Sequence, residues 1–194
     1  MATKELPHPT EAEIQDKCFK EFLRWRHQDS LRVTNWRGWS QRTNRNHSRV
    51  SHFYREYDIA VFYKESDQLM LNGYEVKGWS KIRNEKLIEP PFGEGIDQAL
   101  ALLLQGADFT YAIYPQPKKV EDQVDLKKLC DQFAPYVGLI YVQNDLSMHT
   151  TAREPQRNPH STPDRKKKML ASLVAGGVFS EMSDQPSWVK QQQY

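Results

Sequence analysis

The chain has 194 residues, of which 38% are hydrophobic and 27% charged, and its formal net charge is +2. This length is enough for one domain with a sizeable core, and a mean hydropathy of -0.79 is typical of a polar domain. No apolar run approaches the ~20 residues that span a bilayer. The first fifteen residues, MATKELPHPTEAEIQ, contain no apolar segment that would indicate a secretory signal. We therefore expect a cytoplasmic protein with one domain over residues 1–182 and a polar tail over residues 183–194.

The charge is distributed unevenly along the chain. Residues 24–55 contain eight arginines and a single acidic residue, Asp29, so this segment carries +7 and the rest of the chain -5. Such an asymmetry predicts a positively charged footprint on part of the surface. The two cysteines, Cys18 and Cys130, fall on apolar faces of predicted helices, which favours reduced, buried thiols.

The first half of the chain predicts a helix followed by strands. Thr10 is a suitable N-cap, Glu13 completes a capping box with it, and apolar residues then recur at helical spacing from Ile14 to Trp25. Residues 31–36 are a short strand candidate, and residues 37–52, rich in Arg, Ser, Asn and Gly, are typical of a loop. Residues 57–63 and 69–79 are β-rich runs separated by ESDQ, which together predict a hairpin.

Helices and strands alternate in the second half of the chain. Residues 93–108 predict a largely buried helix with Gly106 as its C-cap. Strands are expected over 109–115 and 136–142, an amphipathic helix over 121–133, and a last helix over 162–175, with Thr162 as N-cap and Pro163 at its first position. The order α-β-β-β-α-β-α-β-α predicts an α/β domain with a mixed β-sheet flanked by helices.

Three charged residues on the predicted hairpin suggest chemistry. Asp58 opens one strand, and Glu75 and Lys77 lie on the other, where side chains two apart point to the same face. Two carboxylates on adjacent strands can share a hard divalent cation such as Mg²⁺, which polarises a phosphodiester and helps to generate hydroxide. A lysine beside them can orient the water or stabilise negative charge on the phosphate.

The stretches REYDIAVFY and NGYEVKGW resemble the PD-(D/E)xK nuclease superfamily, whose members include restriction endonucleases and archaeal Holliday-junction resolvases. The resemblance implies a restriction endonuclease-like fold, with Asp58 and Glu75 as ligands of Mg²⁺ or Mn²⁺ and Lys77 as the catalytic lysine. The proline of the family motif is absent, because Tyr57 precedes Asp58. The function implied is a metal-dependent endonuclease that hydrolyses DNA, including branched or structured DNA.

Two further positions follow from the same resemblance. The resolvase-like branch carries a glutamate at the start of its first helix, and Glu11 fits this position as a third metal ligand or water-positioning residue. Glu13 is the alternative, although its capping box already explains it. Gln98 matches a glutamine that some of these families place on the helix after the lysine strand, but Leu102 stands where their motif has tyrosine.

The arginine-rich loop is the expected DNA-binding segment. Small polar residues surround its basic side chains, and an aromatic ring at its start could stack on exposed bases; the expected contact residues are Arg37, Trp39, Arg42, Arg45 and Arg49. RNA is not excluded as a substrate. Enzymes of this fold that cut both strands often work as dimers, so a homodimer is one arrangement that the resemblance implies.

Simpler interpretations accompany each of these hypotheses. The three hairpin charges could form a solvent-facing cross-strand ion cluster, Glu11 could only complement the helix dipole, and Gln98 could be a polar residue on a buried helix. The RKKK run at 165–168 is more typical of a solvated helix face than of a phosphate site. The alternative function is a non-catalytic nucleic-acid-binding or scaffold protein that retains the nuclease fold.

Overall fold

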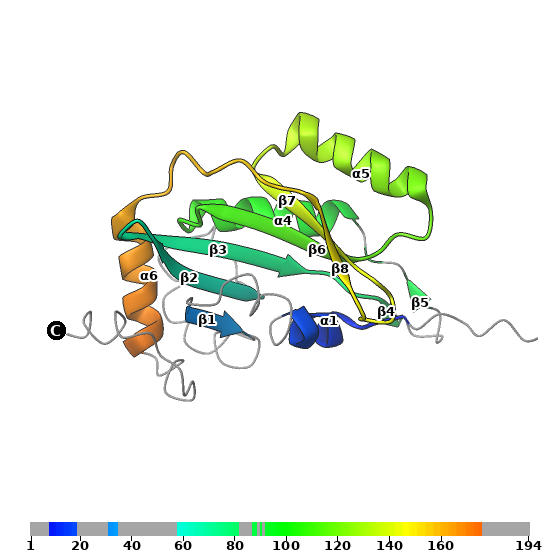
Figure 1. Ribbon diagram of the computed structural model, residues 1–194, viewed down its shortest axis with the longest axis horizontal. Helices are drawn as coiled ribbons and strands as arrows, with labels where there is room; N and C mark the ends of the chain where they lie inside the picture. Colours follow the sequence, from blue (N-terminus) through cyan, green and yellow to red (C-terminus); the bar gives the residue numbers. More distant parts are fainter. Residues whose placement is uncertain are drawn as a thin grey trace, which may run out of the picture.

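The computed structural model describes residues 8–18, 31–34, 58–81, 87–88, 90 and 92–175. Over this part of the chain the protein is an α/β domain with a mixed six-stranded sheet in the order β1-β2-β3-β6-β7-β8 (Figure 1). Its strands are β1 (Leu31–Thr34), β2 (Ile59–Glu65), β3 (Gln68–Val76), β6 (Phe109–Pro115), β7 (Val137–Val142) and β8 (His149–Arg153). The predicted fold class, a mixed sheet flanked by helices, is confirmed, and no helix among these residues is long and apolar enough to cross a membrane.

The sheet combines both kinds of strand pairing. Strands β3, β6 and β7 are parallel in its centre, and β1, β2 and β8 pair with their neighbours in antiparallel fashion at its two sides. The carboxyl ends of the three parallel strands therefore meet at one edge of the sheet. In open α/β sheets this edge is where ligands bind.

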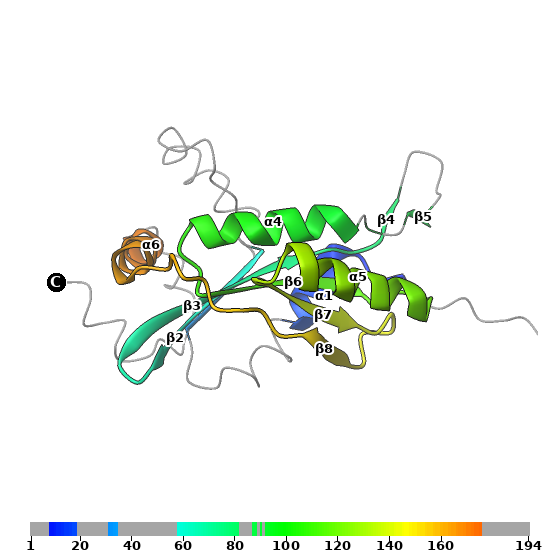
Figure 2. The same cartoon turned by 90° about the horizontal axis from the view of Figure 1, so that it is seen from above.

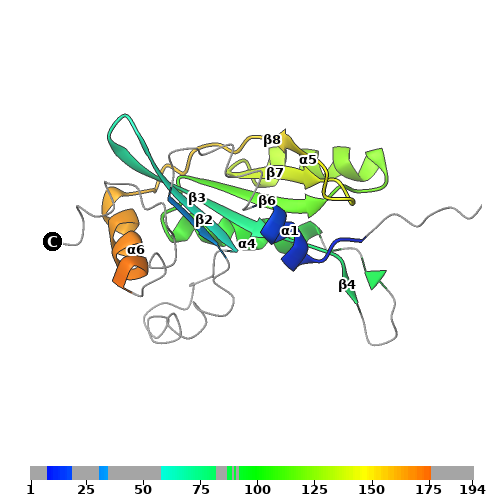
Figure 3. The ribbon, with the colours of Figure 1, turned by 60° about the horizontal axis from the view of Figure 1, so that its bottom comes forward.

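Helices cover both faces of the sheet (Figures 1 and 3). On one face, Ile14 of α1 (Glu11–Lys17) and its C-cap Cys18 belong to a core that includes Tyr74 and Val76 of β3. On the other face, α4 (Phe92–Leu104) and α5 (Val120–Phe133) lie over the sheet (Figure 2) and pack on a second core that includes Tyr114 of β6. Because strand side chains alternate, Glu75, which lies between Tyr74 and Val76, faces the side of the sheet that α4 covers.

Local signals in the sequence set several of these elements. The capping box forms as expected: the backbone N–H of Thr10 donates to Oε2 of Glu13 (2.7 Å), and the N–H of Glu13 donates to Oγ1 of Thr10 (3.3 Å). Strands β2 and β3 form the predicted hairpin, with Ser66 and Asp67 at positive φ in its turn. Gly106 takes a φ of 101° after α4, as a helix C-cap requires. Both cysteines are free and buried.

The structure also contains strands that the sequence analysis did not predict. β8 lies between the strand expected over 136–142 and the helix expected over 162–175, and β4 (Ser80–Lys81) pairs with β5 (Leu87–Ile88) beyond the end of β3. β3 itself ends at Val76, three residues earlier than expected. The half-exposed residues of β8 explain the first omission, because an edge strand with few apolar side chains lacks the pattern from which strands are predicted.

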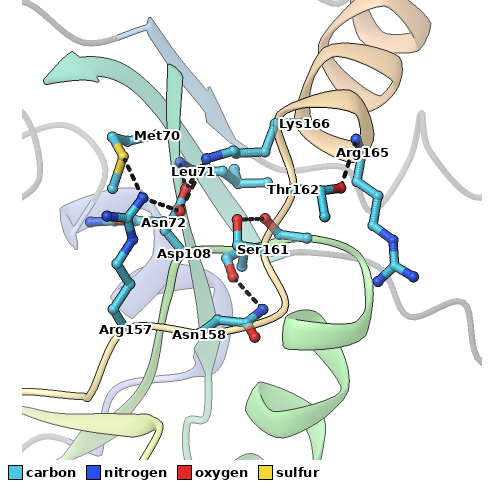
Figure 4. Close-up of polar contacts among 12 residues, drawn as sticks. Met70, Leu71, Asn72, Asp108, Arg157, Asn158, Ser161, Thr162, Arg165 and Lys166 are labelled. Atoms are coloured by element: carbon cyan, nitrogen blue, oxygen red, sulfur yellow. Dashed lines mark hydrogen bonds and ion pairs between the residues drawn. The ribbon is translucent and has the colours of Figure 1, made fainter. Parts of the chain in front are cut away.

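The last helix, α6 (Pro163–Ala175), is attached to the sheet by a buried ion pair (Figure 4). Asp108, just before β6, is fully buried and accepts hydrogen bonds from the backbone N–H of Leu71 (2.9 Å) and from Nζ of Lys166 (2.8 Å). Arg157 approaches the same carboxylate at 3.3 Å, and the Asn158 side chain donates to the carbonyls of Leu103 and Ala107. The expectation that the whole RKKK run is solvated is therefore wrong for Lys166, which is 3% exposed.

Candidate functional site

Glu75 and Lys77 lie together at the carboxyl end of β3 and are almost fully buried. Nζ of Lys77 donates to Oε1 of Glu75 at 2.8 Å, and the two side chains are 8% and 10% exposed for Glu75 and Lys77, respectively. Glu75 pairs in register with Ala112 of β6, which places both charged side chains on the face that α4 covers. A solvent-facing ion cluster, the simpler interpretation of this pair, is therefore excluded by their burial.

Asp58 stands beside this pair because of the hairpin register. Ile59 is opposite Tyr74, so Asp58, one residue earlier, falls opposite Glu75, and opposite residues of an antiparallel pair share a face. Oδ2 of Asp58 accepts a hydrogen bond from the backbone N–H of Val76 at 2.7 Å. The acid is thus held by the same strand segment that carries Glu75 and Lys77.

Glu11 reaches the same point from the start of α1. A side-chain carbon added at Gly78 would collide with the backbone of Thr10 and Glu11, so the glycine allows the helix start to lie directly against the end of β3. The negative charge of Glu11 contributes to raising the pKa of both Glu75 and Lys77. Glu13 is occupied by the capping box, so of the two glutamates Glu11 is the one that adjoins the cluster.

We call Glu11, Asp58, Glu75 and Lys77 the carboxylate–lysine cluster. Burial, the largest cause, and the charges of Asp58 and Glu11 raise the pKa of Glu75 from 4.5 to about 8, against the lowering effect of Lys77. Burial lowers the pKa of Lys77, but the three carboxylates outweigh it and raise that pKa above its ordinary value. With every group ionised the cluster would carry a net negative charge, which a bound cation or proton would offset.

Two residues that the sequence analysis missed shape the space around Lys77. Gly95 of α4 lies against the Lys77 stem, because a side-chain carbon built there would be 3.0 Å from its Cγ and would collide with the Tyr114 hydroxyl. Tyr114 is fully buried, and burial together with the charges of neighbours that include Glu75 raises its pKa. The alternation of side chains along β6 predicts which face of the sheet Tyr114 occupies. Only the order of the strands in the sheet shows that Tyr114 lies beside the cluster.

Gln98 follows Gly95 by one helical turn on α4. It is half-buried, and its Oε1 is buried without a hydrogen-bond partner among the described residues. A buried acceptor in that condition costs free energy unless a donor reaches it. The position fits a residue that faces the cluster, although no direct contact joins Gln98 to the carboxylates. The simpler interpretation, a polar residue on a buried helix, remains compatible with the same geometry.

The expected DNA-binding loop falls outside the part of the chain that the structure describes. Arg37, Trp39, Arg42, Arg45 and Arg49 all lie outside the described residues, as does the tail at 183–194. Their roles therefore stay predictions from the sequence.

The donor set of the cluster is compatible with Mg²⁺ or Mn²⁺. All its anionic groups are carboxylates, the hard oxygen ligands that Mg²⁺ prefers, and Mg²⁺ usually uses only one or two of them while it keeps several waters. Within the described part of the chain, no three His, Cys, Asp or Glu side chains are grouped closely enough to form a cage by themselves. A metal ion at this cluster would therefore use one or two of the carboxylates and keep several waters.

Comparison with known protein families finds no family model that matches the chain, and no curated protein matches it either.

Proposed function

We propose that the protein is a metal-dependent deoxyribonuclease of the PD-(D/E)xK type with the carboxylate–lysine cluster as its active site. The observation that carries the proposal is the gathering of three acidic side chains around one lysine at the carboxyl edge of parallel strands, with Glu75 and Lys77 themselves buried. Buried charges are costly without a partner, and a single lysine does not balance three carboxylates. Such an arrangement is typical of perturbed, functional groups rather than of stabilising ion pairs.

Each residue of the cluster has a role that its position supports. Asp58 and Glu75 would hold Mg²⁺ or Mn²⁺, which when bound supplies charge neutralisation and a water of lowered pKa. Lys77, held by Glu75 at 2.8 Å, would donate to the attacking water or to a phosphate oxygen as negative charge develops there. Glu11 would orient that water from the start of α1. Gln98 would supply a hydrogen-bonding group from α4.

The test is a cleavage assay on a panel of branched, single-stranded and duplex DNAs with Mg²⁺, with Mn²⁺ and with a chelator. We expect cleavage of at least one substrate that depends on the metal and is abolished by Glu75→Gln, which removes the charge but keeps the shape. Glu65→Gln, at an exposed glutamate in the same hairpin, is the matched control and should cleave like the wild type.

Two results would contradict the proposal. Full cleavage by Glu75→Gln would show that the cluster is not the active site. Binding of DNA without cleavage of any panel member would favour the alternative, a non-catalytic nucleic-acid-binding protein.

A further inference from the structure

Three chain segments converge just beyond the end of β3 and bring an indole, an imidazole and an ammonium group together. The backbone N–H of Trp79 donates to the carbonyl of Pro9 at 2.9 Å. The His8 ring lies against the Trp79 ring, with centroids 4.4 Å apart and planes inclined by 54°. Nζ of Lys118 stands 5.4 Å from the centroid of the same indole, within the range of a cation–π contact.

This group adjoins the carboxylate–lysine cluster through the chain itself. Trp79 follows Lys77 by two residues, and Pro9 precedes Glu11 by two. Lys118 comes three residues after the end of β6, the strand that carries Tyr114 beside Lys77. The three side chains therefore lie at the carboxyl edge of the parallel strands, where a substrate of the cluster would approach.

The chemistry of the three side chains is not that of an ordinary packing contact. Trp79 and His8 are half-buried, whereas Lys118 is exposed. Nε1 of Trp79 and Nδ1 of His8 are both buried with no hydrogen-bond partner among the described residues. Buried polar groups are normally satisfied, and exceptions need an explanation such as a functional role.

We propose that Trp79 and Lys118 form a subsite for an unpaired nucleotide of a DNA strand next to the scissile phosphate. The base stacks on the indole in the place of the Lys118 ammonium, and the ammonium moves to the adjacent phosphate. The His8 ring, which lies against the Trp79 ring, holds the indole in position. This inference rests on the proposed function, and it adds a preference for substrates that have single-stranded DNA at the cleavage point.

The relative strengths of the two contacts favour this exchange. Stacking of one base on an aromatic side chain contributes about 5- to 150-fold to affinity, as judged by alanine substitution. An exposed cation–π contact contributes only about 2- to 5-fold. Stacking of a base on the indole therefore contributes more to affinity than the loss of the cation–π contact costs. The ammonium gains a contact with a phosphate in return.

The experiment measures DNA binding by fluorescence anisotropy with Ca²⁺ in place of Mg²⁺. The probes are a dye-labelled single strand of about 15 nucleotides, a length within the range of single-strand binding sites, and a blunt duplex of the same sequence. Trp79→Ala should weaken single-strand binding by about 10-fold, and Trp79→Phe, which keeps an aromatic face, should restore most of it. Neither change should alter blunt-duplex binding.

Lys118→Ala and Lys128→Ala separate a specific phosphate contact from a general loss of charge. Lys118→Ala should lower the slope of log affinity against log salt for the single strand by about 0.7, the value for one contact. Lys128 is an exposed lysine on α5 that pairs with Asp125, and its removal should leave both affinity and slope unchanged. Circular dichroism verifies that each variant is folded.

The subsite is overturned if Trp79→Ala and Trp79→Phe both bind the single strand like the wild type, or if they weaken single strand and duplex equally. It is also overturned if Lys118→Ala behaves like Lys128→Ala. These outcomes are independent of cleavage: a protein that binds single strands through Trp79 but cuts no DNA with Mg²⁺ would retain the subsite and lose the proposed nuclease function.

Discussion

The carboxylate of Asp58 accepts a hydrogen bond from the backbone N–H of Val76, the residue that separates Glu75 from Lys77. Val76 is fully buried, so this N–H has no access to water. One side chain therefore serves two purposes, because it supplies negative charge to the cluster and completes the hydrogen bonding of β3 at its end. The two purposes can be separated by substitution.

Asp58→Asn and Asp58→Ala should differ in stability but not in activity. Both remove the carboxylate charge that is proposed to hold the metal, so both should abolish metal-dependent cleavage. Asparagine keeps an oxygen that can accept from Val76, whereas alanine leaves the buried N–H unsatisfied and should cost about 1–3 kcal/mol. Cleavage assays and urea unfolding of the two variants measure the two effects. Equal stability of the variants would mean that the hydrogen bond contributes little.

Lys77→Met should separate turnover from metal binding. The ammonium is not a metal ligand, so we expect turnover to fall by about 10²-fold or more, as when a donor to the developing charge is removed. Mn²⁺ affinity, measured by isothermal titration calorimetry, should persist, whereas Glu75→Gln should lose it. If Lys77→Met lost Mn²⁺ affinity as completely as Glu75→Gln, the division of roles in the cluster would be wrong.

The stability of the metal-free protein should fall as the pH rises from about 4.5 to about 8. Over this window the raised pKa of Glu75 keeps its carboxyl protonated in the folded state, while it is ionised in the unfolded state. The folded protein then binds more protons, so the free energy of unfolding decreases by up to about 1.4 kcal/mol per pH unit. The raised pKa of Lys77 acts only above its ordinary value of 10.5, outside this window.

Urea unfolding of wild type and Glu75→Gln at several pH values checks this dependence. The variant has no titrating group at this position, so its stability should change less across the window. Parallel curves for the two proteins would show that Glu75 titrates in the same range in the folded and unfolded states.

Gly78→Ala should damage both stability and activity, although it adds only one carbon. That carbon would collide with the backbone of Thr10 and Glu11, so α1 must shift away from β3 and carry Glu11 with it. Overpacking of this kind costs about 1–3 kcal/mol. Thermal melting and cleavage assays measure the two losses.

Gly93→Ala is the matched control for this substitution. Nothing lies within 4 Å of a carbon added at Gly93 on α4, and alanine is the better helix former, so stability should rise by up to about 1 kcal/mol. A similar loss in both glycine variants would indicate that the close approach of α1 is not the cause.

Asp108→Asn should be among the most destabilising single substitutions in the described chain. It leaves the buried Lys166 ammonium without its carboxylate, and breaking a buried pair from one side costs about 3–5 kcal/mol. Urea unfolding measures this cost, with Lys168→Ala on the exposed side of α6 as the control. Cleavage per folded molecule should be unchanged in both. A loss below about 1 kcal/mol would mean that water reaches Lys166.

The parts of the fold that local signals determine could be predicted from the sequence. The capping residues of α1, the β2–β3 hairpin and the end of α4 at Gly106 depend on neighbours within a few positions, and all three were predicted correctly. Register alternation also sufficed to place Glu75 and Lys77 on one face. The proximity of Glu11 to this pair was expected only from the family resemblance, and Gly78 supplies its structural reason.

Contacts between distant segments could not be predicted in this way. Lys166 looked like one of four solvated charges because its partner Asp108 is 58 positions away. The grouping of His8, Trp79 and Lys118 requires the parallel order of β3 and β6, and the edge strand β8 shows too little apolar patterning to be recognised. A single sequence contains the residues of such contacts but not their pairing.

Asp108 and the carboxylate–lysine cluster act on the same strand at separate places. Asp108 binds the backbone of Leu71, four residues before Glu75, which corresponds to about 13 Å along a strand. Substitutions this far apart without shared partners have additive effects on stability. The anchor of α6 can therefore be strengthened by protein engineering, or change during evolution, without affecting the carboxylate–lysine cluster at the other end of β3. Substitutions at the two ends of β3 should therefore be tolerated independently of one another.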